Sequence, residues 1–188
     1  MEQFTYDERG ATDRPFPESL EGGWPAGYTV MVESHDIGTE DPSAGFLALA
    51  EGILAWGLHR RAGLSMTSDA ERAAPGVEVV SGFGVGPARI KAPCQVIWSR
   101  APRLDGTGRA VPGQRSGFGY GTLPGHPVRG EEGFYAELTA DNRVRFICSA
   151  YSVPANVVYR LAAPVTRLTQ GYVLSRYMKA ARELAGEA

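Results

Sequence analysis

A series of short strand-like runs between Leu64 and Ser152 constrains the fold of this chain more than any other feature. The runs are rich in β-branched and aromatic residues, and turn-forming residues separate them. Short connections favour antiparallel pairing, because parallel strands need long crossovers. The predicted strands are Val77–Val80, Ala88–Ile90, Cys94–Trp98, Gly117–Tyr120, Gly133–Leu138 and Arg143–Cys148.

The last two of these runs are joined by Thr139–Asn142, a polar segment of hairpin length. Asp and Asn tolerate the unusual backbone angles of tight turns, so a β-hairpin is predicted here. Another β-prone run, Tyr28–Ser34, follows a turn-forming segment and is predicted to be the first strand.

A helix is predicted between the first strand and the others, from Pro42 to His59. Asp41 is a suitable N-cap, and proline at the first helical position loses no hydrogen bond. Gly45 and Gly52 each weaken the helix by up to about 1 kcal/mol relative to alanine. Packing must therefore hold this helix, and a break into two short helices remains open.

The C-terminal segment from Pro164 to Leu184 is predicted to be a long helix with one buried stripe. The order of strand, helix, antiparallel strands and long closing helix indicates an α+β fold of the helix-grip type. In this fold a curved antiparallel sheet is wrapped around a long C-terminal helix. The length and the absence of a linker-like tract predict a single domain over residues 1–188.

Charge and composition argue against several classes of protein. The net charge of -2 is too balanced for a surface that neutralises many phosphates, so no nucleic-acid partner is expected. The sequence has no basic and apolar leader and no run long enough to span a membrane, so a cytoplasmic location is expected. Cys94 and Cys148 lack the spacing of a disulfide framework and are interpreted as reduced core thiols.

Several motifs together resemble a known family of bacteria and plants, the DUF1990 domain family. The most telling are Phe118–Pro127 (FGYGTLPGHP) and Gly130–Phe134 (GEEGF), and the supporting ones are Trp56–His59, Pro93–Ile97, Ser152–Pro154 and Pro164–Gln170. Val153 stands where the family usually has arginine. The resemblance implies a distant relationship to helix-grip proteins of the Bet v 1-like and START-like type, many of which hold apolar or amphiphilic small molecules. It implies a fold more directly than an activity.

One polar segment between predicted strands is the main candidate site: Tyr120, Thr122, His126, Glu131 and Glu132. A histidine beside a carboxylate is a common general-base pair. Neighbouring strand residues point to opposite faces, so Glu131 and Glu132 are not expected to act together. The alternative interpretation is a rigid turn in which these side chains bond local backbone groups.

His59 and Tyr172 complete the candidate ligand-binding residues, one near the end of the first helix and one on the closing helix. No metal site is expected, because His35, His59 and His126 lack the close spacing of zinc hydrolases. The glycine-rich runs at Gly82 and Gly117 are interpreted as strand bends, and no cofactor is expected.

Three hypotheses follow for the function. The first is a binding protein that holds a small apolar or amphiphilic ligand in a cavity between the sheet and the C-terminal helix. The second is an enzyme that uses His126 with Glu131 or Tyr120 for acid–base chemistry on a substrate in that cavity. The third is a protein-interaction module whose interior is filled by its own side chains. Oligomeric state and catalytic residues are not specified by these patterns.

Overall fold

A computed structural model describes residues 4–14, 23–84, 90–157 and 163–186, with the side chains of 163–170 outside that description. Its main feature is an antiparallel sheet with the strand order β1-β7-β6-β5-β4-β3-β2. The strands are β1 (Thr29–Ile37), β2 (Ser65–Thr67), β3 (Glu78–Phe83), β4 (Ile90–Arg100), β5 (Gln114–Thr122), β6 (Val128–Leu138) and β7 (Val144–Pro154). The predicted antiparallel pairing is confirmed for each neighbouring pair.

The structure corrects the predicted strands at two points. The runs Ala88–Ile90 and Cys94–Trp98 were predicted as separate strands, but Ile90 begins the continuous strand β4, while residues 88 and 89 lie outside the described residues. Strand β2 was not predicted, because its three residues are too short to show any periodicity. The hairpin at Thr139–Asn142 is confirmed, with Asn142 at a positive φ of 59°.

The predicted helix from Pro42 to His59 is two helices, α1 (Pro42–Leu54) and α2 (Gly57–Arg61). Asp41 caps α1 by accepting hydrogen bonds from two backbone amides of its first turn. The chain turns at Trp56, which has a left-handed φ of 63°. The indole of Trp56 is fully buried and donates a 3.0 Å hydrogen bond to the carbonyl of Ala70, which holds this uncommon conformation in place.

The long closing helix is α4 (Ala163–Ala185), and α1 packs closely against it. A side chain at Gly45 would lie 3.0 Å from the Ala185 carbonyl oxygen, and one at Gly52 would lie 2.6 Å from Leu184. The two glycines that weaken α1 therefore allow it to approach α4. The expectation that packing rather than propensity holds this helix is confirmed.

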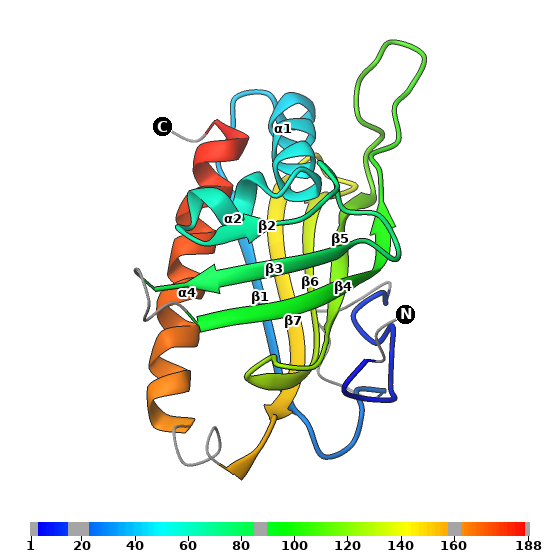
Figure 1. Cartoon of the computed structure of the whole chain (residues 1–188). Coiled ribbons are helices and arrows are strands. Elements are labelled where there is room, and N and C mark those ends of the chain that lie inside the picture. Colours follow the sequence, from blue (N-terminus) through cyan, green and yellow to red (C-terminus); the bar gives the residue numbers. More distant parts are fainter. Residues whose placement is uncertain (1–3, 15–22, 85–89, 158–162, 187–188) are drawn as a thin grey trace.

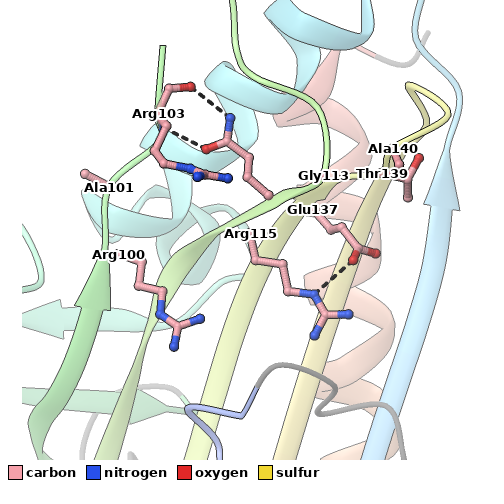
Figure 2. Close-up of a pocket in the computed structure, with 9 residues that line it drawn as sticks. Arg100, Ala101, Arg103, Gly113, Arg115, Glu137, Thr139 and Ala140 are labelled. Atoms are coloured by element: carbon pink, nitrogen blue, oxygen red, sulfur yellow. Dashed lines mark hydrogen bonds and ion pairs between the residues drawn. The ribbon is translucent and has the colours of Figure 1, made fainter. Parts of the chain in front are cut away.

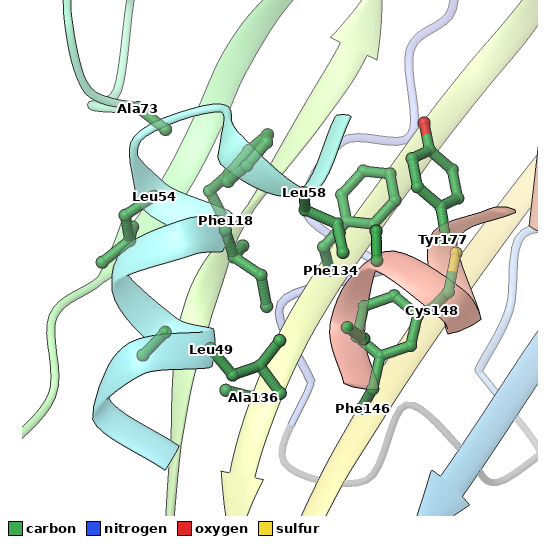
Figure 3. Close-up of a cluster of buried hydrophobic side chains, with 14 of the residues drawn as sticks. Leu49, Leu54, Leu58, Ala73, Phe118, Phe134, Ala136, Phe146, Cys148 and Tyr177 are labelled. Atoms are coloured by element: carbon green, nitrogen blue, oxygen red, sulfur yellow. The ribbon is translucent and has the colours of Figure 1, made fainter. Parts of the chain in front are cut away.

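The helices cover one face of the curved sheet, here called the inner face (Figure 1). Aromatic side chains of the central strands fill the space below α1 and α2, with Phe118, Phe134 and Phe146 fully buried (Figure 3). The other face, here called the outer face, is crossed by the N-terminal segment, residues 4–14, which is bonded to β6 through Thr12. The predicted helix-grip arrangement is confirmed, because the curved antiparallel sheet carries the long closing helix α4 on its inner face together with α1 and α2.

Two further predictions concern the buried thiols and the membrane. Cys94 and Cys148 are both buried and free, as predicted. Within the described ranges, no helix combines the length and apolar character that crossing a membrane requires.

Candidate functional site

Two consecutive glutamates in β6 divide the predicted polar segment between the two faces of the sheet. Glu131 points to the outer face and Glu132 to the inner face, as the alternation of strand side chains requires. The two carboxylates have different hydrogen-bond partners and different surroundings. They are therefore considered separately.

Glu131 is 3% exposed and is saturated with hydrogen bonds. Its oxygens accept from the hydroxyl of Tyr6 at 3.2 Å, the amide of Gly10 at 2.7 Å, the amide of Thr12 at 3.0 Å and the hydroxyl of Tyr151 at 3.0 Å. The Thr12 hydroxyl donates to it as well. A buried carboxylate with this many donors is stable in place, so Glu131 acts as the anchor of the N-terminal segment.

Glycines on the outer face give the N-terminal segment room to lie close to the sheet. A side chain at Gly119 would clash with the indole of Trp98, and one at Gly121 would clash with the ring of Tyr6. The indole nitrogen of Trp98 donates a 3.0 Å hydrogen bond to the Thr12 hydroxyl. These glycines were interpreted as strand bends, whereas the structure shows that Gly119 and Gly121 permit a close approach.

Glu132 has far fewer partners than its neighbour. One oxygen accepts a 3.0 Å hydrogen bond from the hydroxyl of Tyr120, and the other lies 3.6 Å from the sulfur of Cys148. The residue is half-buried, and loss of solvation raises the pKa of its carboxyl above the ordinary value. A proton is therefore held more tightly on this carboxyl than on an exposed glutamate.

His59 lies near Tyr120, the donor to this carboxylate, in an aromatic enclosure. Its ring is fully buried, and its centroid is 4.6 Å from that of Phe134 and 5.2 Å from that of Tyr177. Neither ring nitrogen has a hydrogen-bond partner in the described part of the chain. Burial lowers the pKa of His59 to about 3, so the ring is neutral near pH 7 and offers one donor and one acceptor.

We call His59, Tyr120, Glu132 and Tyr177 the inner cluster. Tyr120 and Glu132 are direct partners across β5 and β6, and the His59 ring lies 6.0 Å from that of Tyr120. Burial raises the pKa of both tyrosine hydroxyls well above the ordinary value, so both remain hydroxyl donors. The turn at Trp56 sets the direction of α2 and so aims His59 at the sheet.

Burial of the inner face decreases across the inner cluster. On the side below α1, Phe118 and Phe134 are fully buried. On the side toward β1, Met31, Ala150 and Glu132 form one cross-strand row and are each half-buried. The inner cluster thus lies where the fully buried core gives way to partly exposed residues.

Two grooves formed by the described residues lie away from the inner cluster. One of about 730 Å³ is lined by Arg100, Ala101, Arg103, Gly113, Gln114, Arg115, Glu137, Thr139 and Ala140 (Figure 2). A second, of about 400 Å³, lies at the start of α1 and is lined by Pro42, Ser43, Asp105, Arg109, Ala110, Pro112 and Asn142. Neither contains a residue of the inner cluster.

The other predicted site residues are not brought into the inner cluster. His126 sits in the turn between β5 and β6, and its Nδ1 accepts a 3.1 Å hydrogen bond from the amide of Val128. Burial lowers the pKa of His126 to about 4. Thr122 accepts from the amide of Gly130 at 3.1 Å, and Tyr172 is 54% exposed.

The predicted residues therefore fall into three places. Tyr120, Glu132 and His59 lie together on the inner face, and Glu131 lies on the outer face. His126 accepts a hydrogen bond within the turn between β5 and β6. Tyr177 is the residue of the inner cluster missing from the predicted set. Its place in the apolar stripe of the closing helix marked it as buried, but no pattern showed that its ring would face a histidine.

Metal binding needs several ligating side chains close together. No group of three or more His, Cys, Asp or Glu side chains comes close enough to hold a metal ion within the described ranges. At the inner cluster, Glu132, the two tyrosines and a neutral imidazole offer hydrogen bonding and proton exchange.

A family model described as a domain of unknown function, DUF1990, matches residues 5–180. The chain belongs to this family. Among curated relatives, a UPF0548 protein of Deinococcus radiodurans is 44% identical over 71 residues, which are 38% of this chain and 32% of that protein. A UPF0548 protein of Arabidopsis thaliana is 33% identical over 81 residues, which are 43% of this chain and 38% of that protein. The matched stretches thus span about a third of the length of these relatives.

Solved structures share the fold at low sequence identity. A hypothetical protein of Helicobacter pylori has a TM-score of 0.60 at 8% identity, and the match covers 89% of this chain and 98% of that one. A norcoclaurine synthase mutant of Thalictrum flavum has a TM-score of 0.52 at 12% identity, with 86% and 97% covered. This DUF1990 chain therefore has the helix-grip fold, which these solved structures share.

Proposed function

We propose that this DUF1990 protein binds a small apolar or amphiphilic molecule between the inner face of the sheet and α4, with the inner cluster as its polar contact. The observation that carries the proposal is the buried His59, whose two ring nitrogens have no partner among the described residues, close to Tyr120, which donates to the sparsely bonded Glu132. Met31 and Ala150, which are partly exposed in the same cross-strand row as Glu132, supply the adjoining apolar surface.

The energetic argument concerns unpaired polar groups. A buried donor or acceptor without a partner costs about 1–3 kcal/mol, so such groups are rare unless something else supplies the partner. A ligand hydroxyl, carbonyl or amine placed next to His59 and Glu132 would satisfy them. Its apolar part would gain roughly 25 cal/mol for each Å² removed from water against the surrounding aromatic rings.

A structural neighbour gives a precedent for a small molecule in this fold. The norcoclaurine synthase of Thalictrum flavum was solved in complex with a transition-state analogue. At 12% identity the likeness concerns the fold alone, so the chemistry of that enzyme is not transferred. The support for binding in this chain comes from its own inner cluster.

A second function, acid–base catalysis, is favoured by one specific observation. Glu132 has a raised pKa and accepts a hydrogen bond from Tyr120, which is the environment of many catalytic carboxyls. This pair replaces the predicted pairing of His126 with Glu131, because those two side chains bond to different partners. In this function Glu132 would act as the general acid and donate a proton to a bound carbonyl or cyclic substrate.

The binding proposal is tested by titrating the protein with N-phenyl-1-naphthylamine, a neutral apolar probe whose fluorescence rises when it leaves water. The decisive variant is Ala150→Phe, which places a ring beside Glu132 on the inner face. The matched control is Ala74→Phe, on an exposed loop.

We expect saturable binding by the wild type and the control, and affinity at least about tenfold lower in Ala150→Phe. Equal binding by both variants would show that the probe sits elsewhere. Absence of saturable binding by the wild type would favour the interaction module with a filled interior.

A further inference from the structure

The 730 Å³ groove lies on the outer side of the sheet, near the base of the connection between β4 and β5 (Figure 2). It is therefore separate from the inner cluster, which faces the helices. Three guanidinium groups border it, those of Arg100, Arg103 and Arg115, and Glu137 is the acidic residue of its lining.

Two of the arginines are held in place by a buried layer of aromatic rings. Trp98 and Tyr135 are stacked with centroids 4.7 Å apart. The guanidinium of Arg100 lies 6.0 Å from the ring of Trp98, and that of Arg115 lies 6.0 Å from the ring of Tyr135. These cation–π contacts limit the motion of both side chains and aim them into the same space.

Carboxylates fix the same two arginines from the side. The Nε of Arg115 donates a 2.9 Å hydrogen bond to Glu137, and both side chains are largely buried. The Nη2 of Arg100 lies 2.7 Å from a carboxylate oxygen of Asp13, in the N-terminal segment. The guanidiniums are thus preorganised, which lowers the entropy lost when they bind a further anion.

The third arginine differs from the other two. The backbone at Arg103 is clamped by Gln114, whose amide oxygen accepts from the Arg103 amide at 2.7 Å and whose amide nitrogen donates to the Arg103 carbonyl at 2.8 Å. Gln114 is 6% exposed, so the clamp is part of the folded core. The guanidinium of Arg103 has no ion pair or hydrogen bond among the residues that the structure describes.

Among the described residues, three arginines and one glutamate line the groove. Glu137 also lies 3.5 Å from Arg145, so this one carboxylate is shared between two arginines. Asp13 neutralises Arg100 alone, and Arg103 is left without a counterion within the described ranges. An arginine presents its donors as a planar fork that fits carboxylate and phosphate oxygens better than other groups.

We propose that this groove binds a small molecule through an oxyanion group, a carboxylate or a phosphate, with Arg103 as the principal contact. Arg100 and Arg115 contribute positive potential from fixed positions. The apolar surface of Ala101 and Ala140 in the same lining accommodates the uncharged part of the molecule. A groove of this volume is in the size range of small-molecule sites.

The test is isothermal titration calorimetry of the full chain at low ionic strength, with glycerol 3-phosphate and citrate as probes. The two probes separate phosphate from carboxylate as the preferred oxyanion. The variant is Arg103→Ala, and its fold is checked by circular dichroism. The matched control is Arg72→Ala, an exposed arginine that pairs with Glu51 outside the groove.

We expect saturable binding of at least one probe to the wild type and to the control. Loss of Arg103 should weaken that binding at least about tenfold, because a hydrogen bond to a charged group contributes about 1.5–3 kcal/mol. Binding that is unchanged in Arg103→Ala, or weakened equally in Arg72→Ala, would overturn the proposal. So would the absence of binding of both probes up to about 10 mM.

Discussion

Glu131 and Glu132 are neighbours in one strand, yet their surroundings differ in a way that separates architecture from function. Glu131, on the outer face, is saturated by donors from the N-terminal segment and from Tyr151. Glu132, on the inner face, has Tyr120 and a thiol. A buried carboxyl with many donors stabilises the fold, whereas one with few donors, in a cluster with a histidine that has no partner among the described residues, remains able to bind something else.

The largest difference between the two glutamates is expected when each is replaced by glutamine. Glu131→Gln leaves several buried donors facing an amide nitrogen, so we expect a loss of about 3–5 kcal/mol in the free energy of unfolding. Glu132→Gln removes a carboxylate whose charge is unfavourable where it lies, so we expect no loss at pH 7. Urea denaturation measures both. Equal destabilisation by the two variants would remove the distinction.

The second prediction uses pH to test the burial of His59. Because the pKa of His59 is lowered in the folded state, the unfolded chain takes up its proton more readily. Stability from this residue is therefore present above pH 6.5, the ordinary pKa, and is lost as the pH falls toward about 3.

His59→Phe should abolish this loss. Between pH 7 and pH 4.5, we expect the free energy of unfolding to fall by about 2–3 kcal/mol less in this variant than in the wild type. Urea denaturation at the two pH values provides the measurement. An equal fall in the free energy of unfolding of the two proteins between these pH values would mean that His59 is solvated or hydrogen-bonded in the folded protein.

The third prediction concerns the outer face alone. Gly119→Ala places a methyl group against the stacked indole of Trp98, so we expect a loss of about 1–3 kcal/mol in thermal or urea unfolding. Gly106→Ala is the control, because no atom lies within 4 Å of the added carbon and the backbone there is unstrained. A Gly119→Ala protein as stable as the control would show that the indole of Trp98 and the hydroxyl of Thr12 do not pack tightly against the sheet at this position.

The smallest effect is expected at the turn. His126→Ala removes one side-chain acceptor for the amide of Val128, and we expect a cost below about 1 kcal/mol. Binding of N-phenyl-1-naphthylamine should be unchanged, because His126 is outside the inner cluster. A loss of probe binding in a folded His126→Ala protein would show that the binding site includes the turn between β5 and β6.

The fold was predictable from the sequence because its signals are local and repeated. The β-prone runs, the Thr139–Asn142 turn and the stripe of the closing helix each follow from residues close together in the chain. The turn at Trp56 was less visible, because a left-handed tryptophan depends on the burial of its ring and on Ala70. The N-terminal segment has no periodic pattern, so its docking on Glu131 could not be predicted.

The candidate site was predicted only in part, because it depends on register and on distant contacts. The alternation of strand side chains correctly separated Glu131 from Glu132. The pairing of Tyr120 with Glu132 needed the register between β5 and β6, which the short strands do not specify on their own. The approach of His59 to Tyr177 joins two helices far apart in the chain.

The central claim, that His59 and its neighbours hold a small molecule on the inner face, is tested most directly by native mass spectrometry. Wild-type protein and His59→Phe are purified from the same cells under identical conditions and compared for bound mass. We predict a defined small-molecule adduct on the wild type and its absence from the folded variant. The same adduct on both proteins, or none on either, would contradict the claim.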